Sequence, residues 1–220
     1  MVMQKDVFWK AGLFTLVVFM SGVLLGYLIE SYRVDEIRNE YRTIEKDWAD
    51  AKIQSRFYDL MEPSFCNESI KENLNFADRV YNEGLKLERF EKNSRLTNEI
   101  LYDKERYVLL KLDFWLNSVF LKDKCKTNYT NLIYFYAQEP NLVQKAGQDA
   151  QSLILKDLKD KYGQDLMLIP VPIDLDIATI NILKDAYNID EIPSLLINEK
   201  IKLTGVNSIE EIEKAIKNGL

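Results

Sequence analysis

The sequence predicts a protein in three parts: one transmembrane helix, an antiparallel α-helical bundle or coiled-coil stalk, and a C-terminal α/β domain. Three observations predict this order. Residues 11–29 carry no charge, residues 30–125 carry apolar side chains at helical spacing, and residues 126–220 alternate short apolar runs with amphipathic ones. Residues 1–10 form a short segment before the first helix.

Composition and charge limit the functions that are open to this chain. The 220 residues carry a net charge of −6, and acidic and basic side chains are interspersed, so no basic surface for nucleic acid is expected. The sequence contains no histidine, and its two cysteines are too far apart for a zinc-ligand spacing. We therefore predict no metal or cofactor, and histidine-dependent catalysis is excluded.

The uncharged run AGLFTLVVFMSGVLLGYLI, residues 11–29, spans about 28 Å as a helix and matches the hydrocarbon core of a bilayer. A cleaved signal peptide is the alternative, but this run is longer than the apolar region of a signal peptide, and no small-residue cleavage site follows it. Gly22 and Gly26 form a G-x-x-x-G motif, which suits a homodimer of membrane helices. The alternative is that these glycines are merely common residues of such helices.

The orientation of this helix is predicted from the cysteines, because the flanking charges do not decide it. Lysines precede the run and arginines follow it. Cys66 and Cys125 each lie beside an N-glycosylation sequon, at Asn67 and Asn128, and glycans and disulfides both belong to exported compartments. Sequons also arise by chance. We predict a single-pass protein of the cell membrane, with residues 1–10 in the cytoplasm and the C-terminal domain outside.

Three helices are expected between the membrane run and the α/β domain. The first places apolar residues in a seam and ends at Glu62-Pro63, because proline disfavours helical geometry in the residue before it. The second begins near residues 67–69 and fades at 91–94, and the third covers about 96–121. Short connections predict that consecutive helices pack antiparallel. The seam comprises Val34, Ile37, Tyr41, Ile44, Trp48, Ala51 and Tyr58.

The seam leaves two arrangements open. Its side chains either face a second copy of the chain or pack against the other two helices of the same chain. Tyr41 and Trp48 are bulky for a two-stranded coiled coil, which favours the bundle within one chain.

The expected path of the helices also predicts a disulfide. If the second helix returns along the first and the third runs outward again, Cys66 and Cys125 lie at the same end of the bundle. A bridge between them would close a loop of about sixty residues. Two free thiols in a reducing compartment are the alternative. A catalytic role for this pair is a further hypothesis, although neither cysteine has the adjacent resolving thiol of a Cys-X-X-Cys motif.

The last part of the chain alternates predicted strands and helices. Pro170 and Pro172 lie in the second expected strand and indicate an irregular or edge position, since proline donates no ladder hydrogen bond. Ser208 is expected to cap the last helix, with Glu211 completing a capping box. The expected elements are a strand at 132–136, a helix at 142–162, a strand at 167–173, a helix at 177–187, and strands at 195–197 and 201–203 before that helix.

This order of elements, about 95 residues long, resembles the thioredoxin fold. The residues that carry the resemblance are IYFYA at 133–137, IDLD at 173–176, AYNIDEIPSLLI at 186–197, and Gly205. Ile192-Pro193-Ser194 matches the cis-proline loop of the family, so the resemblance implies a cis bond at Pro193. Pro140 and Val143 stand where the family has its two redox cysteines, and neither can form a thiolate. The redox activity of the family is therefore not implied here, and we predict no enzymatic activity.

What remains is a binding function. The resemblance implies an apolar surface that holds an extended peptide or a partner protein, formed by Gln138, Pro140, Val143, Ile192, Pro193 and Ser194. The alternative is that the chain's own helical stalk covers this surface. The predicted function is a membrane-anchored, non-catalytic binding or scaffolding module on the extracytoplasmic side, for an unidentified partner. The competing hypothesis is a thiol–disulfide oxidoreductase, or an accessory to one, that uses Cys66 and Cys125.

Two aspartates at the end of an expected strand admit a second kind of site. Asp174 and Asp176 form a D-x-D pair, which could bind a cation. The alternative is a solvated loop and a helix cap, and this spacing alone favours that alternative.

Overall fold

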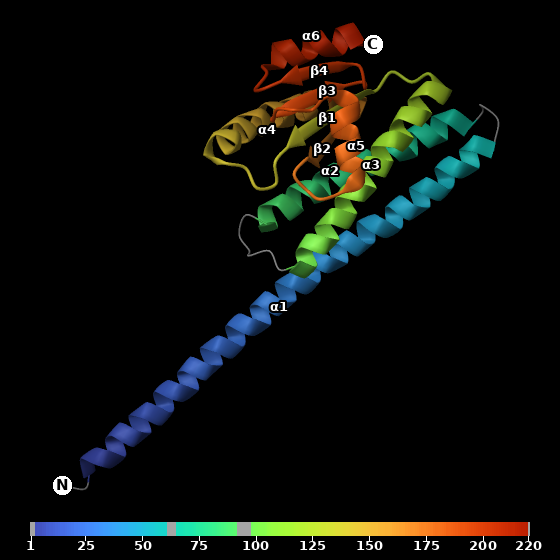
Figure 1. Cartoon of the computed structure of the whole chain (residues 1–220). Helices are drawn as coiled ribbons and strands as arrows, with labels where there is room; N and C mark the ends of the chain where they lie inside the picture. The colour runs from blue at the N-terminus through green and yellow to red at the C-terminus, as the bar shows by residue number, and fades with distance from the viewer. Residues whose placement is uncertain (1–2, 61–64, 92–97, 220) are drawn as a thin grey trace. The chain divides into compact units, whose positions relative to one another are not determined.

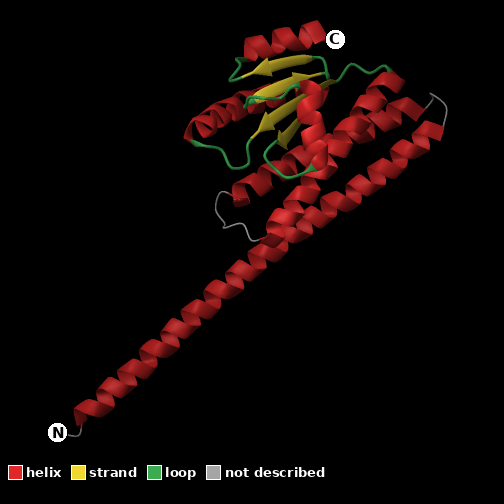
Figure 2. Cartoon of the chain, in the orientation of Figure 1, coloured by secondary structure: helices red, strands yellow, loops and turns green. Residues whose placement is uncertain are grey.

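The computed structural model of the chain describes residues 3–60, 65–91 and 98–219. In this part the protein is mostly helical, with one apolar N-terminal helix and a small mixed sheet of four strands (Figure 1, Figure 2). The chain divides into two compact units, Met1–Arg42 and Thr43–Leu220.

The N-terminal unit contains the first part of helix α1, which runs without interruption through Met3–Leu60. Within it, Phe8–Tyr32 is long and apolar enough to cross a membrane, judged by length and composition, and its apolar side chains are exposed. No heavy atom of a neighbouring side chain in the described part of the chain lies within 4 Å of the position that a Cβ atom would take at Gly22 or at Gly26. The sequence predicted a membrane helix and a separate helix after it. The structure joins them, because no proline interrupts the chain between the two patterns.

In the C-terminal unit, helices α2 (Cys66–Glu91) and α3 (Asn98–Cys125) form an antiparallel pair. The Phe76 ring lies 5.3 Å from the Phe114 ring, measured between centroids. The Tyr107 hydroxyl donates a hydrogen bond of 2.9 Å to the carbonyl of Val80. From Phe76 to Val80 the residue numbers rise along α2, while their partners on α3 fall from Phe114 to Tyr107. This confirms the predicted antiparallel direction of the two helices.

The end of α1 belongs to the same unit and runs parallel to α3. Lys52 lies 2.8 Å from Asp113, and Glu45 pairs with Arg106, so a step of seven residues along one helix matches a step of seven along the other. The up-down-up path expected from the sequence is therefore correct. The seam side chains from Val34 to Tyr58, and the predicted helix end at Glu62-Pro63, lie outside the described residues; the last described residue of α1 is Leu60.

The sheet has the strand order β2-β1-β3-β4. Strand β1 pairs in parallel with β2 and antiparallel with β3, and β3 pairs antiparallel with β4. Strand β2 lies at an edge, as Pro170 and Pro172 predicted. The strands are β1 (Thr130–Tyr136), β2 (Leu166–Pro172), β3 (Ser194–Ile197) and β4 (Ile201–Thr204).

The helices connecting the strands begin and end close to their predicted limits. They are α4 (Leu142–Tyr162), followed by the short helix η2 (Gly163–Asp165), α5 (Ala178–Tyr187) and α6 (Ile209–Gly219). The predicted cap of the last helix is confirmed. The backbone NH of Ser208 donates to the Glu211 carboxylate at 2.8 Å, and the backbone NH of Glu211 donates to the Ser208 hydroxyl at 3.3 Å.

Helices cover both faces of the sheet (Figure 1). Helices α4 and α6 cover one face, where Leu155, Leu158 and Ile212 pack with inward residues of β1 and β3. The α2–α3 pair and α5 lie on the other face, where the Trp115 ring contacts the rings of Phe135 and Tyr187. The C-terminal unit is thus a three-layer structure whose second helical layer begins before the sheet in sequence, so the boundary predicted at residues 125/126 lies inside this unit.

Candidate functional site

Because of the strand directions, four loops lie together at one end of the sheet, where strands end or begin. Strands β1, β2 and β4 end there, and β3, which is antiparallel to β1 and β4, begins there. The loops are residues 137–141, 173–177, 188–193 and 205–208. We call this end of the sheet the loop edge. Four of the six residues predicted to bind a peptide lie in its loops, and the other two, Val143 and Ser194, lie in α4 and β3 close to the ends of these loops.

The first loop is held by a carboxylate from the second. Oδ1 of Asp174 accepts a hydrogen bond of 2.7 Å from the backbone NH of Gln138, and Oδ2 accepts one of 2.9 Å from that of Glu139. Asn141 then caps α4 in a capping box with Gln144. The backbone donors of Gln138 and Glu139 are therefore occupied and do not face a ligand.

The same contacts show the part that Asp174 plays in the structure. Asp174 caps a loop, and α5 starts at an N-cap, Ile177, that has no side-chain hydrogen bond, so Asp176 does not cap it. Among the described residues no group of three or more carboxylate, cysteine or histidine side chains could hold a metal ion.

The third loop ends in a cis peptide bond between Ile192 and Pro193, the isomer that the resemblance implied. The carbonyl of Pro193 accepts a hydrogen bond of 2.8 Å from the backbone NH of Gly205, whose φ of +80° suits glycine. The backbone of Ile192 makes no hydrogen bond to another described residue. Ser194 was expected on the binding surface, but it lies inside β3 with 1% of its surface exposed, so its side chain cannot reach a ligand.

Helix α4 approaches the cis-proline loop closely. A Cβ atom at Gly147 would lie 3.4 Å from Cδ of Pro193 and 3.6 Å from Cγ2 of Val206, both ordinary van der Waals distances, so this part of α4 lies against both residues. One turn along α4, Oε1 of Gln151 accepts a hydrogen bond of 2.7 Å from the backbone NH of Asn207, and its Nε2 donates to the same residue's carbonyl at 3.5 Å. The fourth loop is thereby fixed against α4, which positions Val206.

The result is an apolar surface that we call the ledge: Leu142 and Val143 at the start of α4, with Val206 beside the buried Pro193. Leu142 is 87% exposed, Val143 is 83% exposed and Val206 is 49% exposed. Val143 lies one turn before Gly147 on α4, on the same side of the helix. No described part of the chain covers the ledge. Gln138, Pro140 and Ile192 are half-buried beside it.

The sequence reasoning missed Leu142 and Val206. A signal for Leu142 was present, because two apolar residues directly follow the capping residue Asn141 and the first turn of a helix offers few neighbours to cover them. Val206 follows Gly205, the residue directly after β4, and the sequence around it gave no comparable signal.

The two cysteines lie at disulfide distance. Their sulfur atoms are 2.08 Å apart and their Cα atoms 5.6 Å apart, joining the first residue of α2 to the last residue of α3. Cys125 precedes β1 by five residues, whereas the loop edge follows the other end of β1, so the pair lies at the opposite end of the sheet from the ledge. Asn67 and Asn128, the predicted glycosylation sites, are both exposed near this pair.

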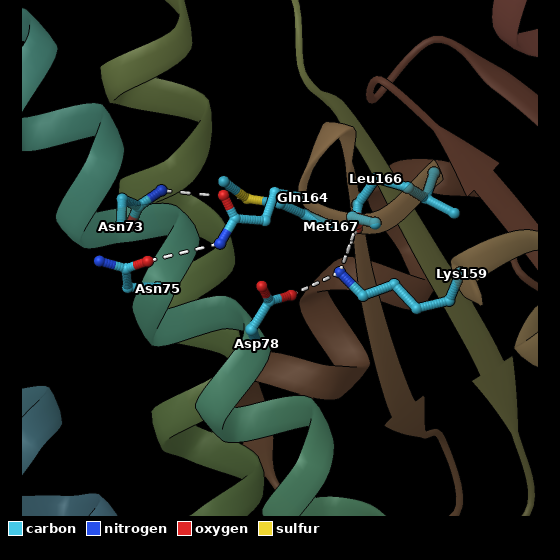
Figure 3. Close-up of polar contacts among 8 residues, drawn as sticks. Asn73, Asn75, Asp78, Lys159, Gln164, Leu166 and Met167 are labelled. Atoms are coloured by element: carbon cyan, nitrogen blue, oxygen red, sulfur yellow. Dashed lines mark hydrogen bonds and ion pairs between the residues drawn. The ribbon is translucent and has the colours of Figure 1, made fainter. Parts of the chain in front are cut away.

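A buried lysine joins α2 to the outer edge of the sheet (Figure 3). The ammonium nitrogen of Lys159 donates to the Asp78 carboxylate at 2.7 Å, to the Gly163 carbonyl at 2.7 Å and to the Leu166 carbonyl at 2.9 Å. These three acceptors match the three N–H bonds of the ammonium group, so the group has none left for a ligand. Lys159 lies one turn after the buried Leu155 on α4, but the same four-residue spacing runs through the exposed Val143, so it gave no signal of burial.

A second lysine makes a similar contact with the same strand. Nζ of Lys111 on α3 donates to the carbonyl of Pro170 at 2.6 Å. Leu166 and Pro170 are four residues apart, so their carbonyls point to the same side of β2. Lysines from α3 and α4 therefore occupy acceptors of an edge strand that would otherwise be open to another strand.

A buried polar network lies between α3 and the turn after β3. The Tyr129 hydroxyl donates to the Ser118 carbonyl at 2.5 Å, and the Ser118 hydroxyl donates to Oδ1 of Asn131 at 2.8 Å. Burial raises the pKa of the Tyr129 hydroxyl to about 12. Asn198, at a φ of +48°, accepts hydrogen bonds from the Lys122 ammonium at 2.7 Å and from the backbone NH of Asn131 at 3.0 Å, and burial lowers the pKa of Lys122. These groups bond to one another, which identifies the network as a structural joint.

Comparison with known proteins adds no family. No family model matches the sequence, and no curated protein matches it. Thirteen chains of solved structures match. One of them, described as "Structure of a malarial protein", is 21% identical over 42% of this chain and 99% of that chain, with a TM-score of 0.33. This similarity is too low to carry an argument.

Proposed function

We propose that this chain is a membrane-anchored, non-catalytic, thioredoxin-like module that binds an extended peptide or a partner protein on the ledge. The observation that carries the proposal is the exposure of Leu142 and Val143 beside the cis-proline loop. These two side chains are neighbours in sequence and, with Val206, form one apolar patch in water, and such patches mark binding surfaces more often than single exposed residues do.

Several observations support the thioredoxin-like part of the proposal. The central β1 pairs in parallel with β2, helix α4 directly follows β1, and a cis-proline precedes β3. Helix α4 packs against that proline at Gly147. Pro140 and Val143, which stand at the positions of the family's redox cysteines, have no thiol, so binding without redox chemistry is the function that this site supports best.

The mode of binding follows from the groups that the loop edge leaves free. The backbone of Ile192 has no hydrogen-bond partner among the described residues, so it can pair with an extended chain as a strand would. Asp174 already occupies the donors of Gln138 and Glu139, so the other side of the ledge offers apolar side chains and no free backbone donors. We therefore assign the hydrogen bonds to the Ile192 side and the apolar contacts to Leu142, Val143 and Val206.

The anchor is the apolar segment Phe8–Tyr32, which we propose remains uncleaved and spans the cell membrane with the N-terminus inside. The flanking sequons and the cysteine pair support an extracytoplasmic position for the C-terminal unit.

The competing hypothesis, thiol–disulfide exchange by Cys66 and Cys125, has one observation in its favour: both cysteines are only half-buried, so a thiolate could reach the bridge. The pair lies away from the cis-proline loop, however, and the ledge takes no part in such chemistry. Alkylation before and after mild reduction, followed by mass spectrometry, separates the two functions. A bridge that resists the reductant supports the binding module, whereas a bridge that opens and closes readily supports the redox hypothesis.

Site-specific crosslinking in native membranes tests the proposed function. A photo-reactive amino acid at position 206 should capture a partner protein, and Val143→Asp should abolish that crosslink without changing the unfolding free energy, because Val143 is exposed. The matched control is Leu153→Asp, which adds the same charge at an exposed leucine elsewhere on α4 and should leave the crosslink intact. Equal crosslinking in all three proteins would contradict the proposal.

A further inference from the structure

We infer that the ledge selects a peptide segment whose apolar residues are flanked by lysine or arginine. This inference rests on the proposed function and adds the chemical class of the ligand. The observations that carry it are the carboxylates around the ledge and the scarcity of basic side chains among the four loops.

Four exposed carboxylates line the loop edge. They come from three of its loops: Glu139 from the first, Asp176 from the second, and Asp190 and Glu191 from the third. None of the four makes an ion pair with a described residue. They remain available to a cationic ligand.

The loops themselves provide no compensating charge. Residues 137–141, 173–177, 188–193 and 205–208 contain no lysine or arginine. Three lysines of neighbouring elements, Lys145, Lys184 and Lys202, lie within four residues of these loops in sequence. Lys145 on α4 is 3.9 Å from Asp149, and the Lys202 ammonium donates to the Asn188 carbonyl at 2.6 Å. Three cations against these four carboxylates and Asp174 leave the loop edge negatively charged.

The arrangement of charge around the ledge matches one kind of ligand. An extended peptide that places apolar side chains on Leu142 and Val143 runs on past the loop edge at both ends, where its flanking residues meet the carboxylates. Lysine and arginine gain from this field, and glutamate and aspartate are repelled by it. A bound metal ion does not account for the carboxylates, because no group of three or more ligating side chains occurs among the described residues.

Fluorescence anisotropy with the purified full chain in detergent tests this selectivity. Three fluorescein-labelled peptides share a Val-Leu-Val core and differ in the pairs of residues on either side: lysines, serines or glutamates. We expect the lysine-flanked peptide to bind about tenfold more tightly than the serine-flanked one, and the glutamate-flanked one to bind most weakly. The advantage of lysine should shrink at high salt, because the charges are exposed.

Two variants make the test specific. The combination Glu139→Gln, Asp176→Asn, Asp190→Asn and Glu191→Gln should bring the three peptides to equal affinity. The matched control is Asp157→Asn with Asp160→Asn. It removes exposed carboxylates that lie about 22 Å or more from Leu142 along α4, and it should preserve the difference in affinity between the three peptides. Equal binding of the three peptides by the unmodified chain overturns the charge selectivity but leaves the ledge as a binding surface. Absence of binding by the lysine-flanked peptide also overturns this inference, while crosslinking at position 206 decides the proposed function separately.

Discussion

The ammonium group of Lys159 lies 2.7 Å from the carboxylate of Asp78, and this contact joins α4 to α2 across 81 residues of sequence. Lys159 is buried, and its other two hydrogen bonds reach carbonyls at the start of β2 and in η2. The helical pair and the sheet are therefore connected by a charged group that is largely buried. A buried charge of this kind is costly to leave unpaired.

Replacing the lysine should destabilise the C-terminal unit. Lys159→Met leaves Asp78 and two carbonyls without their donor, and we expect a loss of about 3 kcal/mol in unfolding free energy. The control is Lys161→Met on the same helix, which breaks the exposed pair with Glu213 and should have little effect. Denaturant unfolding of the full chain, monitored by tryptophan fluorescence, measures the unfolding free energy of both variants. Equal stability of the two variants would contradict the role of Lys159.

Removal of the cysteine bridge should also lower stability. For the sequence separation of 59 between Cys66 and Cys125, the chain-entropy model gives about 4 kcal/mol. We expect Cys66→Ser and Cys125→Ser to be equally destabilised under non-reducing conditions, and the unmodified chain to match them once reduced. If all three proteins unfold at the same denaturant concentration without reductant, the bridge does not form in solution.

Raising the pH should destabilise the folded chain because the Tyr129 hydroxyl is buried. The pKa of its hydroxyl is about 12 in the folded chain and about 10 in an unfolded one, so the stabilising contribution is fully present below pH 10 and is lost as the pH rises through 12. The difference in unfolding free energy between the unmodified chain and Tyr129→Phe should change by about 3 kcal/mol over this range, with the unmodified chain losing stability. A difference that stays constant with pH would show that Tyr129 is not buried.

The chain should not reduce insulin, because Pro140 and Val143, at the proposed positions of a redox pair, have no thiol. The double variant Pro140→Cys with Val143→Cys should gain measurable activity if the surrounding framework is thioredoxin-like. The turbidity of reduced insulin measures both proteins. Activity in the unmodified chain that disappears in Cys66→Ser would instead favour the oxidoreductase hypothesis.

Protease accessibility should report the orientation of the membrane helix. Protease added to intact cells or spheroplasts is expected to remove the C-terminal unit and to spare the residues before Phe8. Full protection of the C-terminal unit would reverse the proposed orientation.

The sequence by itself determined the features that depend on neighbours along the chain. The apolar run at residues 11–29, the helical and strand periods, and the cap at Ser208 with Glu211 are all local patterns, and each has its counterpart in the structure. The meeting of Cys66 and Cys125 followed from short connections between helices, which leave few paths for the chain.

Only the tertiary structure decided which side chains are covered. Val143 and Lys159 belong to the same helix, and nothing local to the sequence shows that the apolar residue is exposed while the charged one is buried. Asp174 likewise holds a loop 36 residues earlier instead of capping the helix that follows it. The physical reason is that burial depends on which distant element packs against a residue: α2 covers Lys159, whereas no described element covers Val143.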